Sequence, residues 1–122
     1  MLFRSKEEND FKKCPPPLDN HLGAGEEVAF IDPAADESGQ CTCGLYNAKL
    51  GLTVKVHFQK NQLPHLTNWQ HWGKNEYVTG LEPGTNPPIG QSAARADNEL
   101  IFLEPNEVRC FDLEIKVFNN QI

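Results

Sequence analysis

The sequence lacks any long apolar run, and basic residues are in the minority. Its apolar stretches are only a few residues long, against the about 20 that a membrane-spanning helix needs. Charged residues follow Leu2 and Phe3 almost at once, which argues against a signal peptide. With 17 Asp and Glu against 11 Lys and Arg, the formal net charge is −6. We therefore expect a cytoplasmic protein without membrane or nucleic-acid partners, because an acidic surface repels phosphates.

Cysteine is also scarce, and its spacing does not suit a metal. The 4 cysteines are Cys14, Cys41, Cys43 and Cys110. Cys41 and Cys43 are separated by one residue, whereas zinc sites usually have about two to four intervening residues and a second ligand pair. There is no glycine-rich phosphate loop either. The sequence therefore predicts free structural thiols, no metal site and no organic cofactor.

The chain divides into a short leader and one domain. Residues 1–22 are dense in charge and include a proline run at Pro15–Pro17, a composition that is typical of a flexible, extended leader. The remaining residues, 23–122, are long enough for a single core. We expect one folded domain over that range.

Most of this domain shows the alternation of strands. In "LTVKVHFQK", Leu52, Val54, Val56 and Phe58 share one side and polar residues the other. Gly44 interrupts the preceding strand, which indicates a bulge or a close backbone approach. The other expected strands are "EEVAFIDP", "CTCGLYNAK", "EYVTGLEP", "ELIFLEP" and "EVRCFDLEIKVFNN", the last two separated by the hairpin-like "PNE". The pattern predicts an all-β, antiparallel β-sandwich.

Two stretches do not show this pattern. "NQLPHLTNWQHWGKN" has no clean period, and its Pro64 excludes a long helix, so we expect a loop or an irregular strand with aromatic anchors. The glycine- and proline-rich segment from Gly84 to Asn98 is predicted to lack secondary structure. Such a long loop is uncommon in a compact domain unless it has a function.

Glu82 is the first candidate for chemistry. It lies at the expected end of a strand, and Pro83 after it constrains the backbone. A carboxylate held there is suited to act as a general base or to accept hydrogen bonds from sugar hydroxyls. The alternative is a solvated glutamate in a turn, since Glu is mostly exposed in proteins.

The aromatic cluster and the long loop supply further candidates. Trp69 and Trp72 could stack on a sugar ring while His71 contacts its hydroxyls, although both indoles could equally belong to the core. In the loop, Asn86 is a candidate for contacts with hydroxyls. Arg95 could hold a carboxylate or a hydroxyl pair, or simply form a surface salt bridge.

The stretches "NWQHW", "YVTGLEPGTN" and "LEPNEVRCFDL" together resemble the C-terminal part of galactose mutarotase-like proteins, the aldose 1-epimerase superfamily, in an uncharacterised branch. The resemblance covers about Glu26 to Asn119. It implies the C-terminal half of a β-supersandwich, a sugar substrate and Glu82 as catalytic base. In the family, that base takes the proton of the anomeric hydroxyl while a histidine protonates the ring oxygen, so the ring opens and recloses as the other anomer without a cofactor.

The sequence departs from this family in its length. The resemblance places the histidine acid upstream of the matching segment, in a half that is absent here, and none of His21, His57, His65 and His71 matches its motif. We therefore expect a carbohydrate-binding, epimerase-like protein, or alternatively a non-catalytic sugar-binding module or a self-associating structural domain. Because a half-sandwich leaves sheet surfaces uncovered, we also expect a homodimer.

Overall fold

The computed structural model describes residues 12, 25–73 and 75–119. Apart from residue 12, the leader expected over residues 1–22 lies outside this range. Among the described residues, no helix is both long enough and apolar enough to cross a membrane.

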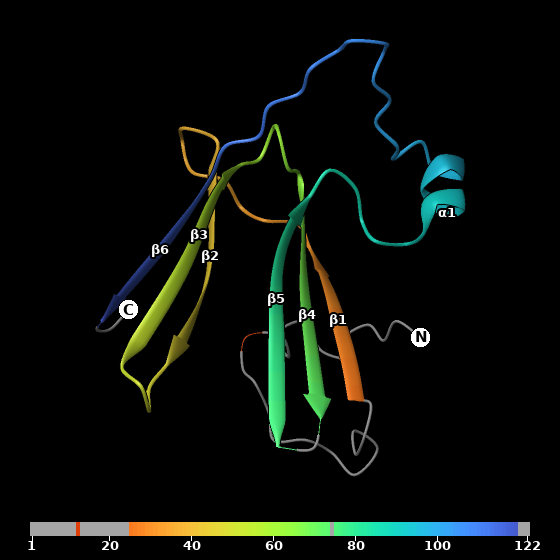
Figure 1. Ribbon diagram of the computed structural model, residues 1–122. Coiled ribbons are helices and arrows are strands. Elements are labelled where there is room, and N and C mark those ends of the chain that lie inside the picture. The colour runs from red at the N-terminus through yellow and green to blue at the C-terminus, as the bar shows by residue number, and fades with distance from the viewer. Residues whose placement is uncertain (1–11, 13–24, 74, 120–122) are drawn as a thin grey trace.

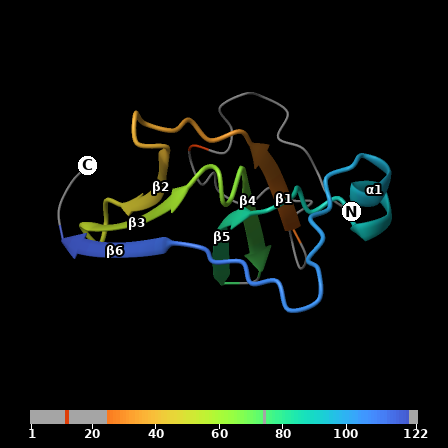
Figure 2. The ribbon, with the colours of Figure 1, turned by 90° about the horizontal axis from the view of Figure 1, so that it is seen from above.

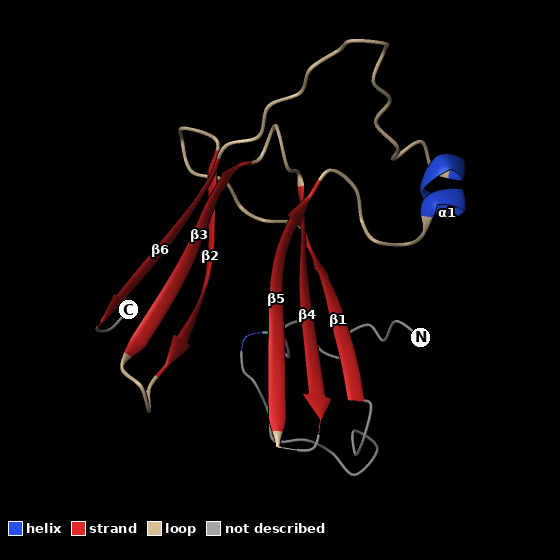
Figure 3. Cartoon of the chain, in the orientation of Figure 1, coloured by secondary structure: helices blue, strands red, loops and turns tan. Residues whose placement is uncertain are grey.

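The described residues form two three-stranded antiparallel sheets (Figure 1). One sheet has the strand order β1-β4-β5 and the other β2-β3-β6. Figure 3 shows how little helix the chain contains beside these strands. The elements are β1 (Gly25–Ile31), β2 (Gln40–Asn47), β3 (Leu52–Gln59), β4 (His65–Gly73), β5 (Glu76–Gly84), α1 (Gln91–Ala96) and β6 (Leu113–Asn119). The predicted all-β antiparallel fold is confirmed.

The core lies where one end of each sheet meets the other. Its buried residues are Cys41, Val56, Phe58, Leu63 and Leu66, and Ile31, Cys43 and Leu81 pack against them. They come from the start of β2, the ends of β1, β3 and β5, the β3–β4 connection and the start of β4. The two sheets approach each other at this end in Figure 1, and Figure 2 shows them side by side from above. Burial of apolar area at this junction is what holds the two sheets together.

The strand with the clearest alternation forms as predicted. β3 places Val56 and Phe58 in the core and pairs with β2 on one side and β6 on the other. A Cβ on Gly44 would lie 2.6 Å from the carbonyl oxygen of Val54. Because the β2–β3 register runs without interruption, Gly44 marks a close backbone approach and not a bulge.

The stretch without a clean period is a regular strand, β4, at the centre of its sheet. The side of β4 that carries Leu66 and Trp72 also carries Asn68 and Gln70, so polar side chains are buried there beside apolar ones. Thr67, Asn68 and Gln70 are all buried. Because polar and apolar residues share this buried side, the sequence of β4 lacks the alternation that marks a half-exposed strand, which explains why the sequence favoured an irregular segment.

Two predictions beyond β5 are wrong. The segment predicted to lack secondary structure contains α1, an alanine-rich turn and a half that begins after Gly90 (φ 92°). The strand expected in "ELIFLEP" and its hairpin are absent: residues 99–112 are irregular, and β6 begins only at Leu113. A turn closes with Glu107 N donating to Glu104 O, and Asn106 has a positive φ of 67°. Without a partner strand, residues with strand propensity remain in an irregular segment.

The Cys41 and Cys43 thiols belong to this core. Cys41 is fully buried and its Sγ donates to Pro33 O at 3.9 Å. Burial raises the pKa of the Cys41 thiol, and burial together with the neighbouring Cys41 raises the pKa of Cys43 to about 11. Cys110 is exposed. All three are free, as the sequence predicted.

The location of the core predicts that replacing a buried phenylalanine destabilises the protein far more than replacing an exposed one. Phe58 is 2% exposed and Phe102 is 69% exposed. Phe58→Ala should lower the free energy of unfolding by about 3–5 kcal/mol, because it removes buried area and leaves a cavity. Phe102→Ala, the matched control, should cost less than about 1 kcal/mol. Urea unfolding followed by circular dichroism measures both, and equal losses would contradict this location of the core.

The raised thiol pKa values predict selective reactivity. At about pH 8, iodoacetamide should alkylate Cys110 much faster than Cys41 or Cys43, because only the thiolate reacts and burial suppresses it. Peptide mass spectrometry assigns the sites, and Cys110 serves as the internal reference. Cys43 labelling as fast as Cys110 would refute this selectivity.

The raised pKa of Cys43 also predicts how stability depends on pH. The free energy of unfolding should fall as pH rises from the ordinary thiol pKa of 9.0 towards about 11, since the thiol ionises in the unfolded chain over that range and does not in the folded one.

Candidate functional site

Glu82 lies within β5, two residues before its end at Gly84. It is opposite Thr67 of β4, and Pro83 is opposite Leu66. The sequence placed Glu82 at the junction of strand and turn, whereas the strand continues through Pro83. Proline is tolerated because β5 is an edge strand among the described strands. Glu82 is exposed and held by a sheet, not by a turn.

Strand alternation gathers several side chains beside Glu82. On β4, Trp69 and His71 have the same parity as Thr67, so they point to the same side as Glu82. Their rings stack, with centroids 5.8 Å apart and an interplanar angle of 21°. On β1, Glu26 is opposite His71, and its Oε1 accepts a hydrogen bond from Trp69 Nε1. We call this side of the β1-β4-β5 sheet the Glu82 face.

Two glycines make room for carboxylates on the Glu82 face. Gly80 is opposite Trp69, and the Glu82 carboxylate lies where a Cβ on Gly80 would be. Glu82 therefore extends along the sheet towards Trp69. In the same way the Glu76 carboxylate lies over Gly73, and its Oε1 is 3.8 Å from His71 Nε2. The stacked rings thus have a carboxylate near each end.

A buried amide fixes β5 at this point. Asn68 is 4% exposed and points to the other side of β4. Its Nδ2 donates to Gly80 O and to Thr79 Oγ1, both at 3.3 Å. A buried amide without hydrogen bonds would lower the stability of the fold. These two bonds therefore help the backbone ladder to hold Gly80, and hence Glu82, beside Trp69.

Trp72 lies apart from the other aromatic candidates. It has the opposite parity to Trp69 and His71, is 2% exposed and packs on Tyr77 with centroids 5.6 Å apart. The strand therefore separates Trp72 from the Glu82 face, because successive side chains of a strand point to opposite sides. Of the two interpretations that the sequence left open for the indoles, the buried one describes Trp72 and the accessible one describes the half-buried Trp69.

Asn86 and Arg95 make local contacts. Asn86 accepts from Thr85 Oγ1 at 3.1 Å and donates to Pro87 O at 3.0 Å. Arg95 is exposed on α1, with its guanidinium 5.9 Å from the centroid of the Phe102 ring. Figure 1 shows α1 to the side of the β1-β4-β5 sheet, near the end where β5 finishes. Among the described residues, the hydrogen bonds of Asn86 and the ring contact of Arg95 do not involve Glu82.

Sequence reasoning missed Glu26, Glu76 and His65 as parts of this region. His65 has the parity of the Glu82 face, and its Nε2 is 3.4 Å from Glu99 Oε2. A signal existed: once β4 is assigned as a strand, parity groups His65 with Trp69 and His71. Identification of Glu26 also requires the register with β1, which the local sequence does not contain.

The Glu82 face is acidic and carries both carboxylates and imidazoles that can form hydrogen bonds. Its carboxylates are Glu26, Glu76, Glu82 and Glu99, and its imidazoles are those of His65 and His71. Carboxylates accept hydrogen bonds from hydroxyls and repel anions, and an aromatic surface covers apolar C–H groups. This combination suits a neutral, hydroxyl-rich ring. Within the described ranges no group of three or more His, Cys, Asp or Glu could hold a metal ion.

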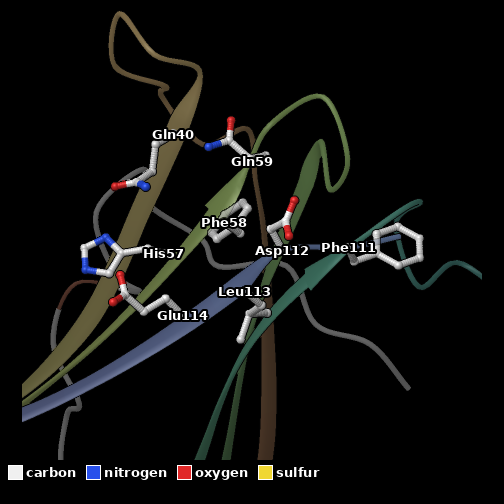
Figure 4. A pocket seen from close by; sticks show the side chains of 8 residues that line it. All are labelled: Gln40, His57, Phe58, Gln59, Phe111, Asp112, Leu113 and Glu114. Atoms are coloured by element: carbon white, nitrogen blue, oxygen red, sulfur yellow. The ribbon is translucent and has the colours of Figure 1, made fainter. Parts of the chain in front are cut away.

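A separate cavity of about 310 Å³ lies on the other sheet (Figure 4). Its polar lining residues are Gln40, His57, Gln59, Asp112 and Glu114. His57 Nδ1 is 2.8 Å from Thr42 Oγ1, whereas its buried Nε2 has no hydrogen-bond partner among the described residues. Asp112 is already engaged by Gln62, whose Nε2 donates to it at 2.7 Å. None of the residues predicted from the sequence to bind sugar lies in this cavity.

The comparisons with known proteins agree with the fold. The chain is similar to a crystal structure of a "putative aldose 1-epimerase" from Klebsiella pneumoniae subsp. pneumoniae MGH 78578, with a TM-score of 0.71 and 32% sequence identity. The match covers 78% of this chain and 25% of that chain, so this chain spans about a quarter of its length. No curated protein matches significantly.

A family model described as "Domain of unknown function (DUF4432)" matches residues 3–117, nearly the whole chain. The resemblance to galactose mutarotase-like proteins, seen first in three short stretches of sequence, is thereby supported by the structural likeness. The chain belongs to the DUF4432 family and is related in fold to aldose 1-epimerases.

Proposed function

We propose that the Glu82 face binds a neutral sugar as part of an aldose 1-epimerase-like protein. The observation that carries this proposal is the arrangement of the Glu82 carboxylate over Gly80, beside the stacked Trp69 and His71. A sugar ring has an apolar C–H face for the indole and hydroxyls for the carboxylate. The structural likeness to a protein described as an aldose 1-epimerase supports the same class of ligand.

In the proposed mechanism Glu82 is the general base. Its exposed carboxylate can accept the proton of an anomeric hydroxyl while Trp69 holds the ring. The finer assignment of this chain to the C-terminal part of the galactose mutarotase-like fold rests on the combined resemblance of "NWQHW", "YVTGLEPGTN" and "LEPNEVRCFDL". Under that assignment, the proton donor to the ring oxygen comes from residues beyond this chain. The chain alone then binds sugar, and efficient anomer exchange requires the remaining part.

A second candidate is a sugar-binding module without catalysis. It is favoured by one observation: the imidazoles of His65 and His71 lie beside carboxylates other than Glu82, at 3.4 Å from Glu99 and 3.8 Å from Glu76. A general acid contributes roughly 10²–10⁴-fold to such a rate. Anomer exchange of a pure α-hexose, followed by NMR with the chain and with buffer alone, separates the two candidates.

Replacement of the base should weaken binding. Glu82→Gln keeps the shape and removes the charge, so the dissociation constant for a bound hexose should rise about ten-fold, as a charge-assisted hydrogen bond is weakened. Glu37→Gln, at an exposed glutamate outside the Glu82 face, is the matched control and should bind like the wild type. Calorimetric titration measures both. Equal affinities for wild type and Glu82→Gln would remove Glu82 from the site.

The two tryptophans should report binding differently. Addition of a neutral hexose should change tryptophan fluorescence in the wild type and in Trp72→Phe, because Trp72 is on the opposite side of β4. Trp69→Phe should abolish the change. A uronic acid at equal concentration should give little response, because the carboxylates of the face repel it. A signal that persists in Trp69→Phe and disappears in Trp72→Phe would place the ligand elsewhere.

A further inference from the structure

The outer strand of the second sheet presents an uncovered apolar row. Leu113, Ile115 and Val117 of β6 are 49%, 62% and 61% exposed. They point to one side, together with Leu45 of β2, which is 40% exposed. Soluble proteins seldom leave aliphatic side chains together on an uncovered strand, because such a row promotes association.

The outer edge of β6 is unpaired among the described strands as well. Among the described strands β6 pairs only with β3, and it forms the edge of the order β2-β3-β6. Figure 2 shows β6 on the outer side of that sheet. One side of its backbone is therefore available for another strand. Natural edge strands are often protected by prolines, bulges or charged side chains; β6 (LEIKVFN) has no proline and a continuous register with β3, and its charged residues are Glu114 and Lys116.

The order of charges on β6 identifies the strand that fits this edge. On the side opposite the aliphatic row, Glu114 and Lys116 flank Ile115, with Lys116 Nζ 3.0 Å from Glu114 Oε2 in the same chain. When a second β6 is laid antiparallel with Ile115 opposite itself, Glu114 faces the partner's Lys116. Lys116 in turn faces the partner's Glu114, and Leu113 faces the partner's Val117. Every pair is then complementary.

Other registers are unfavourable. Moving the two-fold axis from Ile115 to Lys116 places Lys116 opposite the partner's Lys116. Moving it to Glu114 places Glu114 opposite the partner's Glu114. Like charges directly opposite each other are destabilising. When the axis falls between two residues, aliphatic residues lie opposite charged ones, so that one strand has its side chains on the wrong side of the sheet. The charge pattern thus selects one register.

We propose that two copies of this chain associate through antiparallel pairing of β6 with β6, about a two-fold axis at Ile115. The two sheets then form one continuous six-stranded sheet, with the aliphatic rows of both copies adjacent on the same side. A two-fold interface of this kind contacts itself, as most homodimers do. It is independent of the proposed function, because Glu82 and Trp69 belong to the other sheet.

Charge reversal tests the pairing in the full chain. Glu114→Lys alone and Lys116→Glu alone each set like charges opposite each other twice, so each should raise the dimer dissociation constant by about ten-fold or more at low ionic strength. An equimolar mixture of the two variants should form a heterodimer as tightly as the wild type. In that mixture all interchain pairs are again opposite in charge, while neither chain has its internal Glu114–Lys116 pair.

Sedimentation equilibrium over a range of protein concentrations provides the measurement. Ile115→Lys places two ammonium groups together at the axis and should give a monomer. Val108→Lys, at an apolar residue that is 82% exposed and outside β6, is the matched control and should leave the dimer intact. Far-UV circular dichroism establishes that each variant is folded.

Two results would overturn the proposal: a wild-type chain that is monomeric at all concentrations, or a dimer that is unaffected by Glu114→Lys and Ile115→Lys. Sugar binding by Glu82 is measured separately, so a monomer that binds hexose refutes only the β6 pairing. A dimer that binds no hexose refutes only the proposed function.

Discussion

The pairing of β4 between β1 and β5 is the constraint on which the candidate site depends. Trp69 and His71 come from β4, Glu82 from β5 and Glu26 from β1, and only the two registers bring them to one side. A slip of one residue would turn Trp69 and His71 to the other side of the sheet. Burial of Leu66 at the start of β4 opposes such a slip, since it would expose a core residue.

Two glycines of this sheet leave space for the carboxylates of the Glu82 face. Gly80 and Gly73 weaken a strand locally, because they have no side chain to pack. In return each leaves space that a carboxylate occupies, Glu82 over Gly80 and Glu76 over Gly73. The carboxylates therefore lie along the sheet next to the aromatic rings, where they can meet a ligand that rests on Trp69.

The second sheet is only partly covered by the first. The two sheets share a core only at one end, and towards the other end Leu45 and Val117 are exposed. The proposed sugar recognition and the proposed assembly involve different sheets, the first the Glu82 face and the second β6. A change in one leaves the contacts of the other unaltered.

The sequence by itself determined the features that arise from local alternation. β3, the free thiols and the all-β class follow from residues that are near neighbours in the chain. Only the tertiary structure decided that β4 is a central strand, that residues 99–112 form no strand, and that Trp72 lies apart from Trp69. The physical reason is that strand pairing joins residues far apart in sequence. Whether a polar side chain is buried, or an apolar segment finds a partner, therefore depends on neighbours that a local pattern does not contain.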